Sequence, residues 1–212
     1  PLTMTDNNVG WAWRLEDGTL TPGPSPEASA AEFAGLVAEG LADAERKEAY
    51  VFVHGYNNQF HHAALTMAQL WHFMGRPGVP LIYTWPAGRG GLRGYTSDVE
   101  SAQFTTFHLK QFLRALATTP GLEKVHILAH SRGTEVVTTA IKELMLEYRG
   151  SGLDARTELK LGNVILAAPD INLQTARQTL VAEGTIFVPE LFTVYLSESD
   201  RALKLSSWFT DS

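Results

Sequence analysis

Val125-His126-Ile127-Leu128-Ala129-His130-Ser131-Arg132-Gly133 decides the fold, because an apolar run typical of a β-strand stops at a serine and a helical pattern follows at once. A serine on such a tight strand-to-helix turn has its hydroxyl pushed out of the sheet, where it can attack a carbonyl carbon. The positions that flank the turn must be small, and Ala129 and Gly133 meet that demand. We therefore expect Ser131 to be a nucleophile.

The histidines of the chain do not fit this turn in the usual order. All seven lie at or before His130, so none follows Ser131. The serine of such a turn is usually followed first by an acid and then by a histidine. A serine hydroxyl is a weak nucleophile unless a base takes its proton. The sequence therefore indicates a serine chemistry without showing its general base.

Length and composition limit the class of protein. The 212 residues are enough for one α/β domain with a full core and short for two domains. Hydrophobic residues make up 44% and charged residues 19%, which is ordinary for a globular domain. No apolar run approaches the roughly 20 residues that a membrane helix needs, so we expect no membrane span.

Charge and cysteine content exclude further classes. The formal net charge is -6 and the Lys and Arg residues are scattered singly, which argues against a nucleic-acid partner. The chain has no cysteine, so disulfides and thiol nucleophiles are excluded, while the cytoplasm and an export compartment such as a periplasm both fit. The sequence supports no statement about the oligomeric state.

Strand and helix patterns alternate along the chain. Residues 1–24 are rich in Thr, Asn, Gly and Pro and are interpreted as an N-terminal arm or an edge strand, and residues 25–212 as one α/β domain. The alternation predicts a parallel sheet covered by helices on both faces. Strands are expected at 50–53, 79–85, 125–130, 163–168 and 192–196, and helices over 25–44, over 60–74, from a capping box at Ser97 and Glu100, and after Ser131.

The strand ends carry the polar residues expected of an acyl-transfer site. Such a site needs N–H donors for the oxyanion that forms on attack, and backbone donors are fixed before the reaction begins. Arg132 N–H, at the start of the following helix, is the first candidate. Gly55 lets the chain turn sharply, so that the N–H of Tyr56 can be the second.

Two aspartates follow later strands and compete for the role of the acid. Asp200 comes just after the last expected strand, where the acid that orients a histidine belongs. It could also cap a helix that starts at Arg201. Asp170, which follows Pro169 at the end of the preceding strand, is the rival. Chain order favours Asp200.

No metal or cofactor is expected. The chain contains no His-Glu-x-x-His spacing, and His61 and His62 fall on different faces of a predicted helix. The glycine-rich stretch 88–94 follows a strand, yet it fits neither the dinucleotide nor the nucleotide-triphosphate spacing. We interpret it as a loop over the strand ends.

Four ordered motifs resemble a bacterial α/β-hydrolase family long catalogued as a domain of unknown function, the DUF900 type. They are VFVHGYNN at 51–58, AHSRG at 129–133, LAAPD at 166–170, and VYLS at 194–197 with DRAL at 200–203. The resemblance runs from about Tyr50 to Leu205. It implies an α/β-hydrolase sheet, with Ser131 as the nucleophile, Asp200 as the acid and esters as the class of substrate. We expect the substrate to be a small-molecule ester. Such relatives usually carry Met or a similar residue where Arg132 stands, which bears on substrate preference.

The C-terminal end departs from this family. Residues 201–212 are too few for the further helix, strand and histidine-bearing loop that such hydrolases place there. We expect that the chain has been shortened, because Trp208 and Phe209 would form apolar surface that more chain would cover. The alternatives are that an upstream histidine, His61 or His62, has become the base, or that the protein is a catalytically inactive, hydrolase-like binding module.

Overall fold

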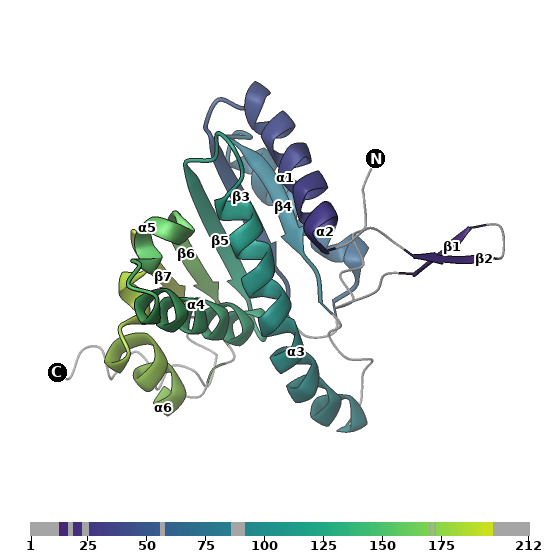
Figure 1. The fold of residues 1–212 in the computed structure, drawn as a ribbon. Coiled ribbons are helices and arrows are strands. Elements are labelled where there is room, and N and C mark those ends of the chain that lie inside the picture. The colour runs from purple at the N-terminus through teal and green to yellow at the C-terminus, as the bar shows by residue number, and fades with distance from the viewer. Residues whose placement is uncertain are drawn as a thin grey trace.

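The computed structural model describes residues 13–16, 19–22, 26–55, 58–85, 92–169, 171 and 173–196. Its centre is a five-stranded sheet in the order β4-β3-β5-β6-β7, in which every neighbouring pair is parallel (Figure 1). The strands match the five predicted apolar runs. They are β3 (Glu48–Val53), β4 (Val79–Tyr83), β5 (Lys124–His130), β6 (Leu161–Ala167) and β7 (Leu191–Tyr195).

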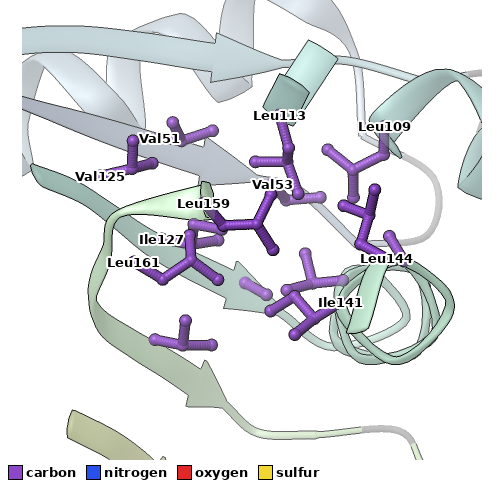
Figure 2. Close-up of a cluster of buried hydrophobic side chains, with 14 of the residues drawn as sticks. Val51, Val53, Leu109, Leu113, Val125, Ile127, Ile141, Leu144, Leu159 and Leu161 are labelled. Atoms are coloured by element: carbon purple, nitrogen blue, oxygen red, sulfur yellow. The ribbon is translucent and has the colours of Figure 1, made fainter. Parts of the chain in front are cut away.

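Helices cover both faces of this sheet, as the alternation predicts. The main core lies on the face that α1 (Pro26–Asp43), α3 (Leu92–Ala117) and α4 (Gly133–Gly150) cover (Figure 1). Every second residue of β3 and β5 points into it, which is the period of a strand. Figure 2 shows aliphatic side chains of this core packed together, among them Val51, Val53, Leu109, Leu113, Val125, Ile127, Ile141, Leu144, Leu159 and Leu161.

The opposite face of β3 packs against α2 (Phe60–Phe73). Phe52 of the strand forms a second buried cluster with Ala63 and Met67 of this helix. The two buried faces explain why β3 is a continuous apolar run rather than an alternating one. The predicted α/β fold class, a parallel sheet with helices on both faces, is therefore confirmed.

The register brings the carboxyl ends of the strands to one level. Val53 pairs with Tyr83 on one side and with Ala129 on the other. Further along the sheet, Ala129 pairs with Leu166, and Ala167 pairs with Tyr195. The residues that follow these strands therefore meet at a single edge, which is where open parallel sheets bind ligands.

Short elements connect the later strands. Asp154 caps α5 (Ala155–Leu159) by accepting a hydrogen bond from the backbone N–H of Arg156. Between β6 and β7 lie α6 (Leu173–Ala176), the π-helical segment η1 (Arg177–Ala182) and the 3₁₀ turn η2 (Thr185–Phe187). Near the N-terminus, β1 (Trp13–Glu16) and β2 (Thr19–Pro22) pair antiparallel as a separate two-stranded sheet.

One helix start was predicted wrongly. The capping box of Ser97 and Glu100 indicates a helix that begins near residue 98, but α3 begins at Leu92, so both residues lie inside it. A serine followed three residues later by a glutamate can also stand in a helix interior, because side chains three positions apart lie on one helix face. The pair therefore did not mark the helix start.

Candidate active site

Ser131 lies between the end of β5 and the start of α4, in a backbone conformation that residues other than glycine rarely adopt. Its φ is 50°, in the left-handed region, whereas Arg132 after it has helical angles of −57° and −28°. A non-glycine residue in this region carries strain of about 1–2 kcal/mol, and such strain concentrates at functional sites. The sequence predicted the position of Ser131 at this junction.

Hydrogen bonds hold the Ser131 backbone on both sides. Its N–H donates to the carbonyl oxygen of Ala167 at 3.0 Å, which ties it to β6. Its own carbonyl oxygen accepts from the N–H of Thr134 at 3.0 Å and from the Thr134 hydroxyl at 2.6 Å. The sheet and the first turn of α4 together therefore fix the strained residue.

Two glycines let the strand ends approach each other. A Cβ on Gly55 would lie 2.8 Å from the Cβ of Ser131 and 2.9 Å from the carbonyl oxygen of His130. A Cβ on Gly133 would lie 2.5 Å from the carbonyl oxygen of His54. Real Cβ atoms do not come this close, so both positions require glycine. The loop after β3 is thus packed against Ser131 and the start of α4.

His54 is buried where β3 ends. Its ring Nε2 accepts the backbone N–H of Trp85 at 3.2 Å, and its Nδ1 lies 2.9 Å from the carbonyl oxygen of Gly55. The Trp85 Nε1–H donates to the carbonyl oxygen of His54 at 2.9 Å. Burial lowers the pKa of His54, and the hydrogen bond to Gly55 only partly offsets this, so the neutral ring is favoured.

Arg132 stands directly before the first residue of α4. A helix start of this kind presents backbone N–H groups and the positive end of the helix dipole. The side chain of Arg132 turns to Glu135, with Nε 3.3 Å from the carboxylate. Its charge is therefore partly neutralised within α4 itself.

The structure brings together some of the predicted site residues. Ser131 and Arg132 are adjacent at the start of α4, and Gly55 is packed against them. The other predicted residues, Tyr56, Asp200 and the rival Asp170, lie outside the described residues. Their roles remain predictions.

All seven histidines belong to the part of the chain that the structure describes, and none of them hydrogen-bonds to the Ser131 hydroxyl there. His61 and His62 lie in the first turn of α2, exposed, with ring centroids 4.0 Å apart. His130 is exposed at the end of β5. His54 already uses both ring nitrogens, so it is not free to act as a base.

The contact between His54 and Trp85 was not predicted from the sequence. His54 follows one expected strand and Trp85 ends the next, but the two residues are 31 positions apart in the chain. Both residues follow the carboxyl ends of neighbouring parallel strands, and this common position is the signal that could have predicted their contact.

The residues that the structure describes contain neither a metal centre nor a membrane-spanning helix. Within those ranges, no group of three or more His, Cys, Asp or Glu side chains could hold a metal ion. Among the helices described there, none is long and apolar enough to cross a membrane.

The parallel sheet, its helices on both faces and the serine after β5 define an α/β-hydrolase fold. The chain belongs to the family described as "Alpha/beta hydrolase of unknown function (DUF900)", which matches residues 29–212. Among solved structures, it is similar to an inhibited esterase B from Lactobacillus rhamnosis, with 15% sequence identity and a TM-score of 0.38. The similarity covers 84% of this chain and 67% of that one. No curated protein matches the chain.

Proposed function

We propose that this member of the α/β-hydrolase family is a serine hydrolase that cleaves a small carboxylic ester through an acyl-enzyme on Ser131. One observation carries the proposal. Ser131, in a left-handed backbone conformation, lies between a buried parallel strand and a helix, with Gly55 packed against it. This is the geometry that a serine nucleophile needs to leave the sheet and meet a carbonyl carbon.

The reaction divides into two acyl transfers. In the first, the Ser131 oxygen attacks the ester carbonyl while a base takes its proton, and the tetrahedral intermediate expels the alcohol, which receives that proton. In the second, water attacks the acyl-enzyme in the same manner and releases the acid. The backbone N–H groups of Tyr56 and Arg132 are proposed to hold the oxyanion in both steps.

Asp200 is proposed to orient the histidine that acts as the base, with Asp170 as the rival acid. An aspartate in this role keeps the imidazole in the tautomer that can accept the serine proton. Replacing Asp200 with Asn should lower kcat strongly, and replacing Asp170 with Asn should lower it little. The opposite ranking would assign the acid to Asp170.

The proposal is tested by ester turnover in the full-length protein. We expect hydrolysis of short-chain p-nitrophenyl esters that Ser131→Ala abolishes, with no loss of folded protein by circular dichroism. Single His61→Ala and His62→Ala variants test whether either histidine is the base. If one of them is, its loss should lower kcat by about 10²-fold or more.

A second candidate function is a non-catalytic binding module on a hydrolase scaffold. The observation that favours it is that, within the described residues, none of the seven histidines hydrogen-bonds to the Ser131 hydroxyl. This candidate predicts that the wild-type protein and the Ser131→Ala variant show the same background turnover of esters. It also predicts that short esters still raise the thermal midpoint of unfolding, which scanning calorimetry with and without the ester would show.

A further inference from the structure

His54 and Trp85 join the ends of two neighbouring strands beside Ser131. Their rings are stacked, with centroids 5.8 Å apart and planes inclined by 7°. The two residues are 1% and 6% exposed. Two hydrogen bonds run between them, one from the backbone N–H of Trp85 and one from its indole N–H. The loop after β3 is thereby attached to the end of β4.

These bonds define which ring nitrogen of His54 carries the proton. Nε2 receives a backbone N–H from Trp85, so it acts as an acceptor. The carbonyl oxygen of Gly55, 2.9 Å from Nδ1, can only accept, so Nδ1 is the donor. One neutral tautomer satisfies both contacts. His54 therefore has a defined structural task and no proton to exchange with a substrate.

We propose that His54 is a positioning residue of the ester-cleaving site, in which its Nδ1–H holds the carbonyl group of Gly55 and so fixes the backbone that packs against Ser131. This inference rests on the proposed function. It goes beyond that function because His54 touches neither the substrate nor the reacting atoms. It acts through the peptide group that it orients.

The geometry of the peptide bond explains how the effect is transmitted. A trans peptide is planar, and its carbonyl and N–H point in opposite directions. Holding the carbonyl oxygen of Gly55 would therefore also fix the orientation of the peptide bond that Gly55 forms with the next residue. The N–H of that peptide bond is the oxyanion donor proposed for Tyr56. Losing one such donor usually lowers kcat by about 10²–10³-fold. The loss of one ordinary hydrogen bond has a smaller effect on the free energy of unfolding than this change in kcat corresponds to.

Contact with Ser131 makes the position of this loop critical. A Cβ on Gly55 would lie 3.3 Å from the Ser131 oxygen, so the backbone at Gly55 is a direct neighbour of the nucleophile. The start of α4 is equally close to the end of β3, because a Cβ added at Gly133 would overlap the carbonyl oxygens of Val53 and His54. His54 and Gly55 are thus held between Trp85 after β4 and the start of α4.

Two substitutions separate the two ring contacts. In His54→Asn, the side-chain amide N–H₂ stands at the place of Nδ1 and can still donate to Gly55, while the acceptor for Trp85 is lost. In His54→Gln, the side-chain oxygen can reach the place of Nε2 and accept from Trp85, while the donor to Gly55 is lost. We expect the Asn variant to keep kcat within about threefold. We expect the Gln variant to lose about 100-fold in kcat with KM nearly unchanged.

The thermal midpoint of each variant is measured beside its kinetics. A purely structural role predicts equal kcat per folded molecule in both variants, and that result would overturn the proposal. If the Gln variant does not fold, the Asn variant still decides, because a folded Asn variant with kcat lowered more than tenfold also overturns it. His126→Gln is the matched control, a partly buried histidine in the middle of β5 that should lower stability and leave kcat unchanged.

The outcomes distinguish this inference from the proposed function. If Ser131→Ala leaves ester turnover unchanged, the proposed function fails and the positioning role fails with it. If Ser131→Ala abolishes turnover while the Gln variant keeps wild-type kcat, only the positioning role is wrong.

Discussion

Gly55 packs against Ser131 so closely that a methyl group on Gly55 would lie 2.8 Å from the Ser131 Cβ. The loop after β3 and the serine after β5 therefore occupy one shared surface, although 76 positions separate them in the chain (131 minus 55). Neither can move without displacing the other.

Gly55→Ala should lower kcat by about 10²-fold, because the added methyl group displaces the proposed oxyanion loop from Ser131. Ester turnover in the full-length protein measures the effect. Gly35→Ala is the control, since Gly35 lies in α1 with no atom within 4 Å of its added Cβ. The control should keep full activity and gain about 0.5–1 kcal/mol of stability. Equal activity in the two variants would contradict a role of this contact in catalysis.

Gly133→Ala should destabilise the fold by about 1–3 kcal/mol, because the added Cβ would lie 2.5 Å from the His54 carbonyl oxygen and 2.8 Å from that of Val53. Backbone atoms of a buried strand cannot give way as a flexible side chain can. Urea unfolding measures the change. Gly150→Ala, at the other end of α4 with no neighbour within 4 Å, should change stability by less than about 0.5 kcal/mol.

Ser131→Gly should stabilise the protein by about 1 kcal/mol while it abolishes ester cleavage. Glycine adopts a φ of 50° without strain, and this relief exceeds the entropy that an extra glycine adds to the unfolded chain. Ser131→Ala keeps the strain and should show no such gain. Urea midpoints of the two variants decide, and equal midpoints would mean that the turn stores no strain. Ala168 has a φ of 46°, so Ala168→Gly should give a similar gain in stability.

The stability of the fold should decrease as the pH falls below about 6.5. Burial lowers the pKa of His126, and the neighbouring Glu48 carboxylate only partly offsets this. Burial also lowers the pKa values of His54 and His108. The unfolded chain then binds more protons than the folded one below pH 6.5, so stability is full above this value and is lost towards the lowered pKa values.

His126→Asn isolates one part of this pH dependence. His126 accepts the backbone N–H of Asn163 at its Nδ1, at 3.0 Å, and an Asn oxygen at the same place could still accept it. We expect the free energy of unfolding of the variant to fall less steeply between about pH 6.5 and 5 than that of the wild type. Glu48, Lys124 and Glu190 also act on the ring, so both proteins are compared at one ionic strength. If the free energy of unfolding depends on pH equally steeply in both proteins, His126 does not contribute to the pH dependence.

Much of the fold could be predicted because its signals are local. Buried parallel strands are continuous apolar runs, and glycine or proline marks their ends, so β3 through β7 were located within two residues at each end. Ser131 was located because a strand pattern stops there and the flanking Ala129 and Gly133 are small. Such features depend on residues close in the chain.

Other features depend on contacts across the sheet. The start of α3 at Leu92 was missed because a short polar pattern around Ser97 is compatible with a helix end and with a helix interior alike. The pairing of His54 with Trp85 requires the register of β3 against β4, which a single sequence does not contain. For the same reason the sequence did not indicate which nitrogen of His54 donates.

The most direct test of the central claim is covalent labelling of the full-length protein with a fluorophosphonate, followed by mass spectrometry of its peptides. The account predicts one adduct, on Ser131, that disappears in Ser131→Ala and forms more slowly in His54→Gln than in His54→Asn. An adduct on another residue, or ester turnover that persists at the wild-type rate in Ser131→Ala, would contradict it.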